Sequence, residues 1–139
     1  MKTYSLKIDP LTNEEYIEVA LRGQQVLNDP FLNKGSSFSE EERLSIGLSG
    51  LVRANVSTIE TQRARSYEMY SRKQDDIERY IFLQSLLNRN ETLFYSLLKE
   101  HLIEMLPIVY TPVVGQACLM LSRITREYRG IYIDRKSVV

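Results

Sequence analysis

Two long runs of apolar residues at helical spacing, between positions 75 and 106, constrain the fold more than any other feature of the chain. The first begins at Asp75 or Asp76, and its apolar side chains cover nearly the whole circumference of a helix: Ile77, Tyr80, Ile81, Phe82, Leu83, Leu86 and Leu87. Asn90 is a good N-cap for a second helix, which Pro107 is expected to end and whose apolar stripe comprises Phe94, Leu97, Leu98, His101, Leu102 and Met105. A helix that is apolar nearly all round is buried on most faces, so the pattern predicts a helical domain with the first of these helices inside it.

The remainder of the chain also favours helices. Thr12-Asn13-Glu14-Glu15 has the form of a capping box that opens a first helix, and Ser39 with Glu42 forms a second box on a short helix ending near Gly47. A polar helix is predicted to reach about Lys73, and a further helix to run from about Val113 to Arg126. Only Gly130-Ile131-Tyr132-Ile133 alternates like a strand. The predicted fold class is therefore all-α: a single compact multi-helix domain over residues 1–139, with a short strand candidate at its C-terminal end.

Composition excludes several classes of function. The 18 basic residues balance the 18 acidic ones, which gives no electrostatic reason to expect nucleic acid or an anionic membrane as a partner. No apolar run approaches the roughly 20 residues that span a bilayer. One cysteine, Cys118, rules out an internal disulfide and fits a reducing compartment. The first residues lack the apolar segment of a signal peptide, so the expected location is the cytoplasm, or the mitochondrial matrix if a presequence was removed.

The chain contains few groups that could carry chemistry. It has neither a phosphate-binding glycine loop nor a dinucleotide fingerprint, and one His with one Cys cannot make a usual zinc site. His101 is expected to be packed on an apolar stripe, and Cys118 to be a small buried side chain. Tyr110 lies on a short segment between Pro107 and Pro112. It is either a core residue or a positioned acid, because a phenol keeps its proton at neutral pH.

Four ordered blocks of sequence resemble malic enzymes. They are residues 27–43, the pair 79–83 and 88–95, residues 105–118 (MLPIVYTPVVGQAC), and residues 129–133. The third block is long and specific. The resemblance implies that the whole chain, residues 1–139, is the N-terminal helical domain of a malic enzyme, whose catalytic and dinucleotide-binding domain is absent from it.

The resemblance also implies a chemical role. Malic enzymes oxidise malate with NAD or NADP and decarboxylate the product on a divalent metal, Mg or Mn, to give pyruvate and CO₂. The tyrosine of the YTP block is their general acid, which assigns to Tyr110 the proton that enolpyruvate receives at carbon. In malic enzymes the lysine base, the metal ligands and the dinucleotide fold come after the part that this sequence resembles, and none of them is present in residues 1–139. We therefore expect no cofactor or metal to be bound by this chain, and no activity from it alone.

Regulation and assembly are also implied. The N-terminal region of malic enzymes forms much of a subunit interface, so a homo-oligomer is expected, most simply a dimer. Some members bind an activator such as fumarate there through arginines. Arg89 matches one such position, as an effector or interface residue, and the second arginine would be Arg63 or Arg65. The alternative is a stand-alone helical module that self-associates without catalysis.

Overall fold

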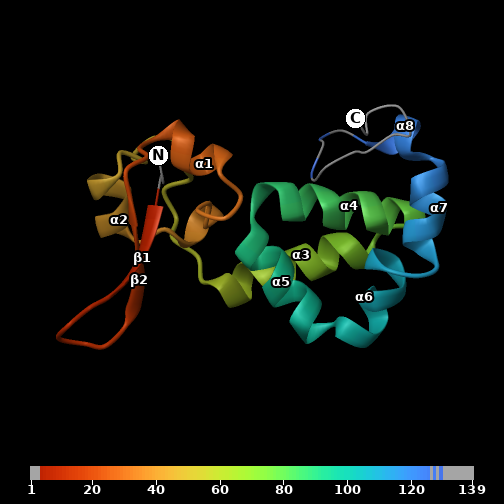
Figure 1. The fold of residues 1–139 in the computed structure, drawn as a ribbon, viewed down its shortest axis with the longest axis horizontal. Helices are drawn as coiled ribbons and strands as arrows, with labels where there is room; N and C mark the ends of the chain where they lie inside the picture. The colour runs from red at the N-terminus through yellow and green to blue at the C-terminus, as the bar shows by residue number, and fades with distance from the viewer. Residues whose placement is uncertain (1–3, 126, 128, 130–139) are drawn as a thin grey trace, which may run out of the picture.

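The computed structural model describes residues 4–125, 127 and 129, which form two lobes (Figure 1). The small lobe, residues 4–57, contains β1 (Tyr4–Ile8), β2 (Glu15–Val19), α1 (Gln24–Asn28), the 3₁₀ turn η1 (Gly35–Ser37) and α2 (Glu40–Ser45). The helical lobe, residues 58–125, contains α3 (Ile59–Ser71), α4 (Asp76–Arg89), α5 (Glu91–Glu100), α6 (Leu102–Val109), α7 (Val113–Leu119) and α8 (Leu121–Ile124).

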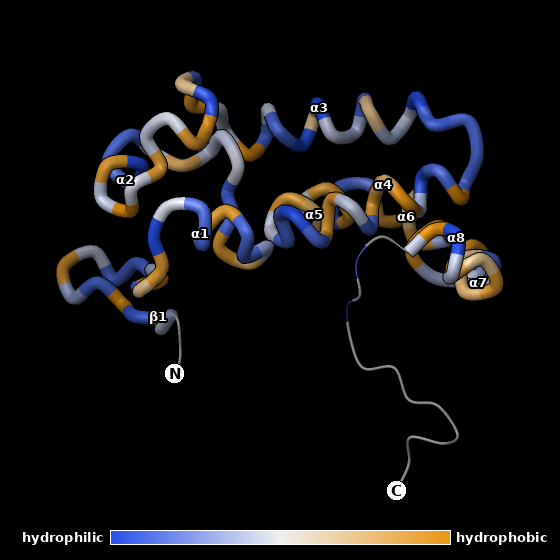
Figure 2. Tube along the Cα trace, turned by 90° about the horizontal axis from the view of Figure 1, so that it is seen from above, coloured by the Kyte–Doolittle hydropathy of each residue, from blue (hydrophilic) through white to orange (hydrophobic). Residues whose placement is uncertain are grey.

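The helical lobe is built around α4, as its nearly continuous apolar circumference predicts. α4 packs against α3, α5, α6 and α7. The shared core consists of Tyr70, Leu83, Leu86, Leu93, Phe94, Leu97, Met105, Ile108 and Val113, all of them buried. Polar residues predominate along α3, whereas apolar ones gather on α4 to α7 (Figure 2). α3 therefore covers the core on one side and presents most of its surface to solvent.

Three predicted helix starts are confirmed. The Asp75 side chain accepts a hydrogen bond from the Glu78 amide, 2.8 Å away, and begins α4. Asn90 does the same for α5, accepting from the Leu93 amide at 2.9 Å. Ser39 and Glu42 close both halves of a capping box at the start of α2. Each cap satisfies an amide that the first turn of a helix would leave unpaired, which is why these short polar signals located the helices well.

The later helix boundaries differ from the prediction. The stripe from Phe94 to Met105 is divided at His101, which caps the end of α5 and the start of α6. Pro107 does not end a helix but lies inside α6. The helix expected over 113–126 is interrupted at Met120, which separates α7 from α8. Helical periodicity continues across a short break, so it detects the apolar face but not the break.

The first helix predicted from Thr12-Asn13-Glu14-Glu15 is wrong, because β1 and β2 form an antiparallel hairpin there. Leu6 pairs with Ile17, and Lys7 with Tyr16. The Thr12 hydroxyl accepts from the amide of Glu14, a turn contact that competes with a helical cap. Asp9 accepts from the Leu11 amide at 2.8 Å, and Asn13 adopts a φ of 59°. These contacts close a turn and leave alternating residues of the strands on opposite faces.

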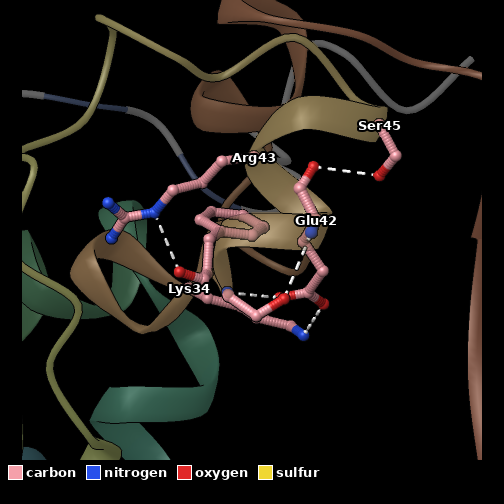
Figure 3. Close-up of polar contacts among 6 residues, drawn as sticks. Lys34, Glu42, Arg43 and Ser45 are labelled. Carbon is pink, nitrogen blue, oxygen red and sulfur yellow. Dashed lines mark hydrogen bonds and ion pairs between the residues drawn. The ribbon is translucent and has the colours of Figure 1, made fainter.

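A buried arginine organises the small lobe. Only Val26, Leu32, Phe38 and Leu48 form its apolar core among the described residues. Beside them Arg43 is 6% exposed, and its guanidinium donates to four carbonyls: those of Ser36 (3.1 Å), Phe38, Arg53 and Ala54 (2.9 Å each). Figure 3 shows Arg43 and its neighbour Glu42 pointing in opposite directions from α2, Glu42 toward Lys34. The loop that precedes α3 is thus fixed by side-chain donors.

The fold class is confirmed as predominantly helical, with the hairpin as an addition that the sequence analysis did not predict. The strand candidate at 130–133 lies outside the described residues. One stretch, Leu102–Leu119, is apolar enough by length and composition to span a membrane, with a mean hydropathy of 1.5 over 18 residues. It comprises α6 and α7, which are separated by Tyr110 to Pro112, and only 22% of it is buried.

Candidate functional site

Tyr110 lies at the joint between α6 and α7. Its amide donates to the Leu106 carbonyl at 2.9 Å, which ends α6, and its carbonyl accepts from the Val114 amide at 2.8 Å in the first turn of α7. Val113 is buried and anchors the start of α7. The backbone of Tyr110 is thus fixed on both sides, while its side chain is 65% exposed. Of the two readings left open by the sequence, the structure excludes a buried core residue.

The surface around Tyr110 is strongly apolar. Large side chains of α6 and the end of α7 lie in solvent, with Ile103 92% and Leu119 90% exposed. Leu102 and Leu106 are each 48% exposed. We call these residues, with Tyr110, the α6–α7 apolar surface. Large apolar side chains exposed in such number on one part of a folded domain mark a surface that contacts another body.

A separate, basic cavity of about 890 Å³ lies where the two lobes meet. Three arginines line it, each from a different element: Arg53 from the loop before α3, Arg65 from α3, and Arg89 from the end of α4. None of the described residues that line the cavity is acidic. Within the described part of the chain, these three guanidiniums make no ion pair. The cavity therefore concentrates positive charge in a chain whose formal net charge is zero.

Polar side chains fix the walls of this cavity. Asn33 donates to the Leu27 carbonyl at 2.8 Å and accepts from the Gly35 amide at 2.8 Å. Gln62 donates to the Lys34 carbonyl at 3.0 Å and also to Ser37. Gly35 has a φ of +59°, and a Cβ there would lie 2.8 Å from the Gln62 Oε1 atom. Only glycine fits this close approach without strain.

The structure separates the two arginines that the sequence left as alternatives. Arg65 lines the basic cavity with Arg89, whereas Arg63 pairs with Glu100 and donates to the Ser96 hydroxyl at 3.1 Å. Arg63 thus ties α3 to α5 and is occupied. Tyr110 is not among the residues that line the cavity. The predicted site residues therefore belong to two separate places.

The other two residues considered in the sequence analysis, His101 and Cys118, do not line the basic cavity. His101 stacks on Tyr67 with ring centroids 3.7 Å apart, and the Tyr67 hydroxyl donates to Glu104 at 3.0 Å. That hydrogen bond raises the pKa of Tyr67. Cys118, expected to be buried, is exposed instead. Val113 and Ala117 occupy the inward face of α7, and the next residue along a helix points away from that face.

A metal site and a dinucleotide site each need a characteristic set of residues. Nowhere in 4–125, 127 and 129 do three or more His, Cys, Asp or Glu side chains gather as metal ligands. The sequence also has no glycine-rich dinucleotide turn. Within the described part of the chain, neither of these two patterns marks a metal or NAD site.

Comparison with known proteins now bears on the two sites. Residues 87–138, which include Tyr110 and Arg89, match the family "Malic enzyme, N-terminal domain". This segment is therefore similar to the N-terminal domain of malic enzymes. NAD-dependent malic enzyme 3 of Bacillus subtilis (strain 168) is 52% identical over 124 residues, which are 89% of this chain and 22% of that protein. The NAD-dependent malic enzyme of Pseudomonas aeruginosa (strain LESB58) is 51% identical over 112 residues, 81% of this chain and 20% of that protein.

The malic enzyme of Acinetobacter baylyi, also named NAD-dependent, is 47% identical over 123 residues, covering 88% of this chain and 22% of that protein. The chain thus spans about a fifth of the length of the curated relatives it matches. The similarity confirms the resemblance drawn from the four sequence blocks. It extends over most of this chain, including much of the small lobe as well as the helical lobe.

Two features of the basic cavity were beyond the sequence analysis. Arg53 follows a turn and precedes Ala54-Asn55, with no periodicity or motif to place it near Arg65 and Arg89. The burial of Arg43 was equally unpredictable, because an arginine in a short polar helix is usually exposed. Arg43 is buried because its guanidinium binds four loop carbonyls. These carbonyls come together only in the folded chain, so the sequence gives no sign of them.

Proposed function

We propose that the chain is the N-terminal, substrate-side part of a malic enzyme and that Tyr110 is its general acid. The observation that carries this is the exposed phenol on a fixed backbone, inside a segment that matches the malic enzyme N-terminal domain. The relatives are named NAD-dependent, so NAD is the proposed cofactor, with a divalent metal as the family resemblance implies. A cytoplasmic location is proposed on the single cysteine.

In this function NAD and the metal, held outside this chain, would supply oxidation and decarboxylation. The chain itself contributes the last proton. A tyrosine phenol ordinarily keeps its proton at neutral pH, so it can deliver that proton to the carbon of the enolate form of enolpyruvate and form pyruvate. The hydrogen bonds of Tyr110 to α6 and α7 limit the motion of its backbone, which favours a fixed approach of the donor.

The test is Tyr110→Phe in the full-length protein that contains this chain. We expect malate oxidation to pyruvate to fall by about 10²- to 10⁴-fold while the affinity for malate is retained, because only the donated proton is lost. Tyr95→Phe, an exposed tyrosine of α5, is the matched control. Unchanged turnover in Tyr110→Phe would remove the assignment.

The basic cavity supports a second role, that of an effector site. Arg89 with Arg65 offers two guanidiniums that can each bind a carboxylate in bidentate fashion, and a dicarboxylate such as fumarate fits that charge. Calorimetry of the chain with fumarate should show binding that Arg89→Gln and Arg65→Gln abolish and Arg63→Gln preserves. Equal loss in all three variants would mean that the response is not specific to the cavity.

The α6–α7 apolar surface supports the proposed homo-oligomer, with a dimer as the simplest form. Sedimentation of the chain at micromolar concentration should give a species of twice the mass, and Ile103→Glu, on the most exposed of these side chains, should give a monomer. The alternative function, a self-association module without catalysis, predicts the same dimer. It differs in predicting that Tyr110→Phe changes no activity of any longer protein that contains the chain.

A further inference from the structure

We propose that Arg53 is the third cationic residue of the basic cavity and that the cavity takes a small acid with three anionic groups in preference to one with two. The proposal rests on the effector role given to this cavity above and specifies its ligand. It concerns a residue that neither the sequence blocks nor the resemblance placed in a site.

The charge of the cavity is the first observation. A second cavity, of about 990 Å³, lies at the same junction and shares Gln62 and Asn90 with the basic one. It is lined by Glu15, Glu42 and Glu60 with one lysine, Lys34. The basic cavity has three arginines and, among its described lining residues, no acid. Opposite charges are thus segregated on two sides of one junction, and only the basic side can attract an anion.

The fixed position of Arg53 is the second observation. Its carbonyl and that of Ala54 both accept from the Nη1 atom of the buried Arg43, at 2.9 Å. A second donor of the same guanidinium holds the Ser36 carbonyl, and the Ser57 amide donates to that carbonyl at 3.0 Å. The loop carrying Arg53 is therefore tied to η1 and to α2 before any ligand arrives. A cationic side chain on such a loop loses little backbone entropy on binding.

The third observation is the convergence of rigid elements. Arg65 lies within α3, whose cap is the Thr58 hydroxyl, and Arg89 is the last residue of α4, next to the buried Asn90. Loop, helix and helix end each contribute one arginine to the lining of a single cavity. Two carboxylates can pair with two of these cations and leave the third without an anion. A third anionic group pairs with that cation and forms another charge-assisted hydrogen bond.

The volume agrees with this ligand class. A cavity of about 890 Å³ is larger than a four-carbon dicarboxylate needs, and ligand cavities in proteins run from about 300 to 1,000 Å³. Asn55 on its wall supplies a neutral amide that can orient a longer acid. The inferred ligand is a carbon chain with three carboxylate or phosphate groups.

Two probes that differ by one carboxylate test the inference. Glutarate carries carboxylates on the ends of a three-carbon chain, and propane-1,2,3-tricarboxylate adds one on the middle carbon. Titration calorimetry of the 139-residue chain should show the tricarboxylate binding about tenfold or more tightly than glutarate, since one charge-assisted hydrogen bond contributes at least that factor. Arg53→Gln should reduce the preference to within about twofold and leave glutarate affinity unchanged. Arg72→Gln, on the exposed end of α3, is the matched control, and urea unfolding confirms that each variant is folded.

The outcomes separate the two proposals. If Arg53→Gln leaves the preference intact, or weakens both probes equally, the third-cation inference is overturned while the effector role stands. If neither probe nor fumarate binds the wild-type chain, or if Arg89→Gln changes nothing, both the inference and the effector role are overturned. Binding of 2,3-bisphosphoglycerate, which carries one carboxylate and two phosphates, with the same dependence on Arg53 would show that phosphate can replace a carboxylate in this class.

Discussion

In the helical lobe the interior is filled almost entirely by apolar side chains, nine of them in one buried cluster, whereas the small lobe has four buried apolar residues arranged around a guanidinium. The helical lobe forms from local sequence signals, namely caps and a helical apolar stripe. The small lobe forms from contacts between loops, which Arg43 joins through four carbonyls. The comparison teaches that stability in one lobe depends on apolar volume and in the other on hydrogen-bond donors.

The largest change in the free energy of unfolding is expected from Leu97→Ala in α5. Leu97 is fully buried in the helical core, and its truncation leaves a cavity that costs about 2–5 kcal/mol of the free energy of unfolding. A urea titration monitored by circular dichroism measures this loss of stability. Leu48→Ala removes an equally buried side chain from the small lobe, where fewer apolar neighbours surround it, and should cost less. A greater cost for Leu48→Ala would contradict the contrast between the lobes.

The next effect is expected from Arg43→Met, which keeps much of the side-chain length but removes every donor. Four carbonyls lose this donor, and among the described residues only that of Ser36 keeps another, the Ser57 amide, so we expect a loss of about 2–3 kcal/mol. Hydrogen exchange should quicken in residues 36–57 while amides of α4 and α5 stay protected. Arg72→Met on the exposed end of α3 serves as control and should change little. Uniform loss of protection in both lobes would show that they unfold as one unit.

A smaller effect concerns Tyr70, the one core residue of the helical lobe with a buried hydroxyl that lacks a hydrogen-bond partner among the described residues. Burial is the main cause that raises its pKa to about 12. In the unfolded chain the phenol ionises near pH 10, so its contribution to stability is complete below pH 10 and is lost as pH rises toward 12, by about 2–3 kcal/mol.

Tyr70→Phe should therefore flatten the decline in stability between pH 10 and 12. At pH 7 it should stabilise the lobe by about 1 kcal/mol, since it removes an unpartnered polar atom. Urea unfolding at pH 7 and pH 11 tests both points, with the exposed Tyr95→Phe as reference. If Tyr70→Phe destabilises the chain at pH 7, the hydroxyl has a partner and the interior of this lobe is less apolar than we describe.

The smallest change in stability is expected when a helix N-cap is removed, and the two lobes can be compared on this point. Ser39→Ala removes half of the capping box of the six-residue α2 and should cost about 1 kcal/mol. Asp75→Ala removes the cap of the 14-residue α4, which four other helices support, and should cost no more than that. Differential scanning calorimetry compares the two variants. A larger loss for Asp75→Ala would mean that α4 depends on its cap despite its packing.

The difference between the lobes also explains what the sequence could predict. α4 and α5 were located because Asp75 and Asn90 act within their own first turns, and because their stripes repeat locally. The hairpin was missed because Thr12-Asn13-Glu14-Glu15 fits a capping box and a tight turn equally well, and only strand pairing with residues 4–8 decides between them. At His101, where the helical stripe breaks, the imidazole stacks on Tyr67, a residue remote in sequence that periodicity could not bring into view.

For the candidate sites too, residues marked by local sequence signals could be predicted, and residues placed by contacts remote in sequence could not. Tyr110 was found because two prolines and the block around it are local signals, and the structure adds only that its side chain is exposed. Arg89 was named through its block, Arg65 was left as an alternative to Arg63, and Arg53 was not predicted. Arg65 and Arg53 reach the same cavity through the packing of α3 on the small lobe and through Arg43, and neither contact leaves a pattern in the sequence.

The exposed position of Cys118 has a practical consequence. It is the only thiol in the chain, and it lies on α7 beside Leu119 of the apolar surface. A maleimide dye or a nitroxide would attach there without any engineered residue. Two labelled copies would then report their separation directly, by energy transfer or by electron spin resonance, so the geometry of assembly can be measured on the natural sequence.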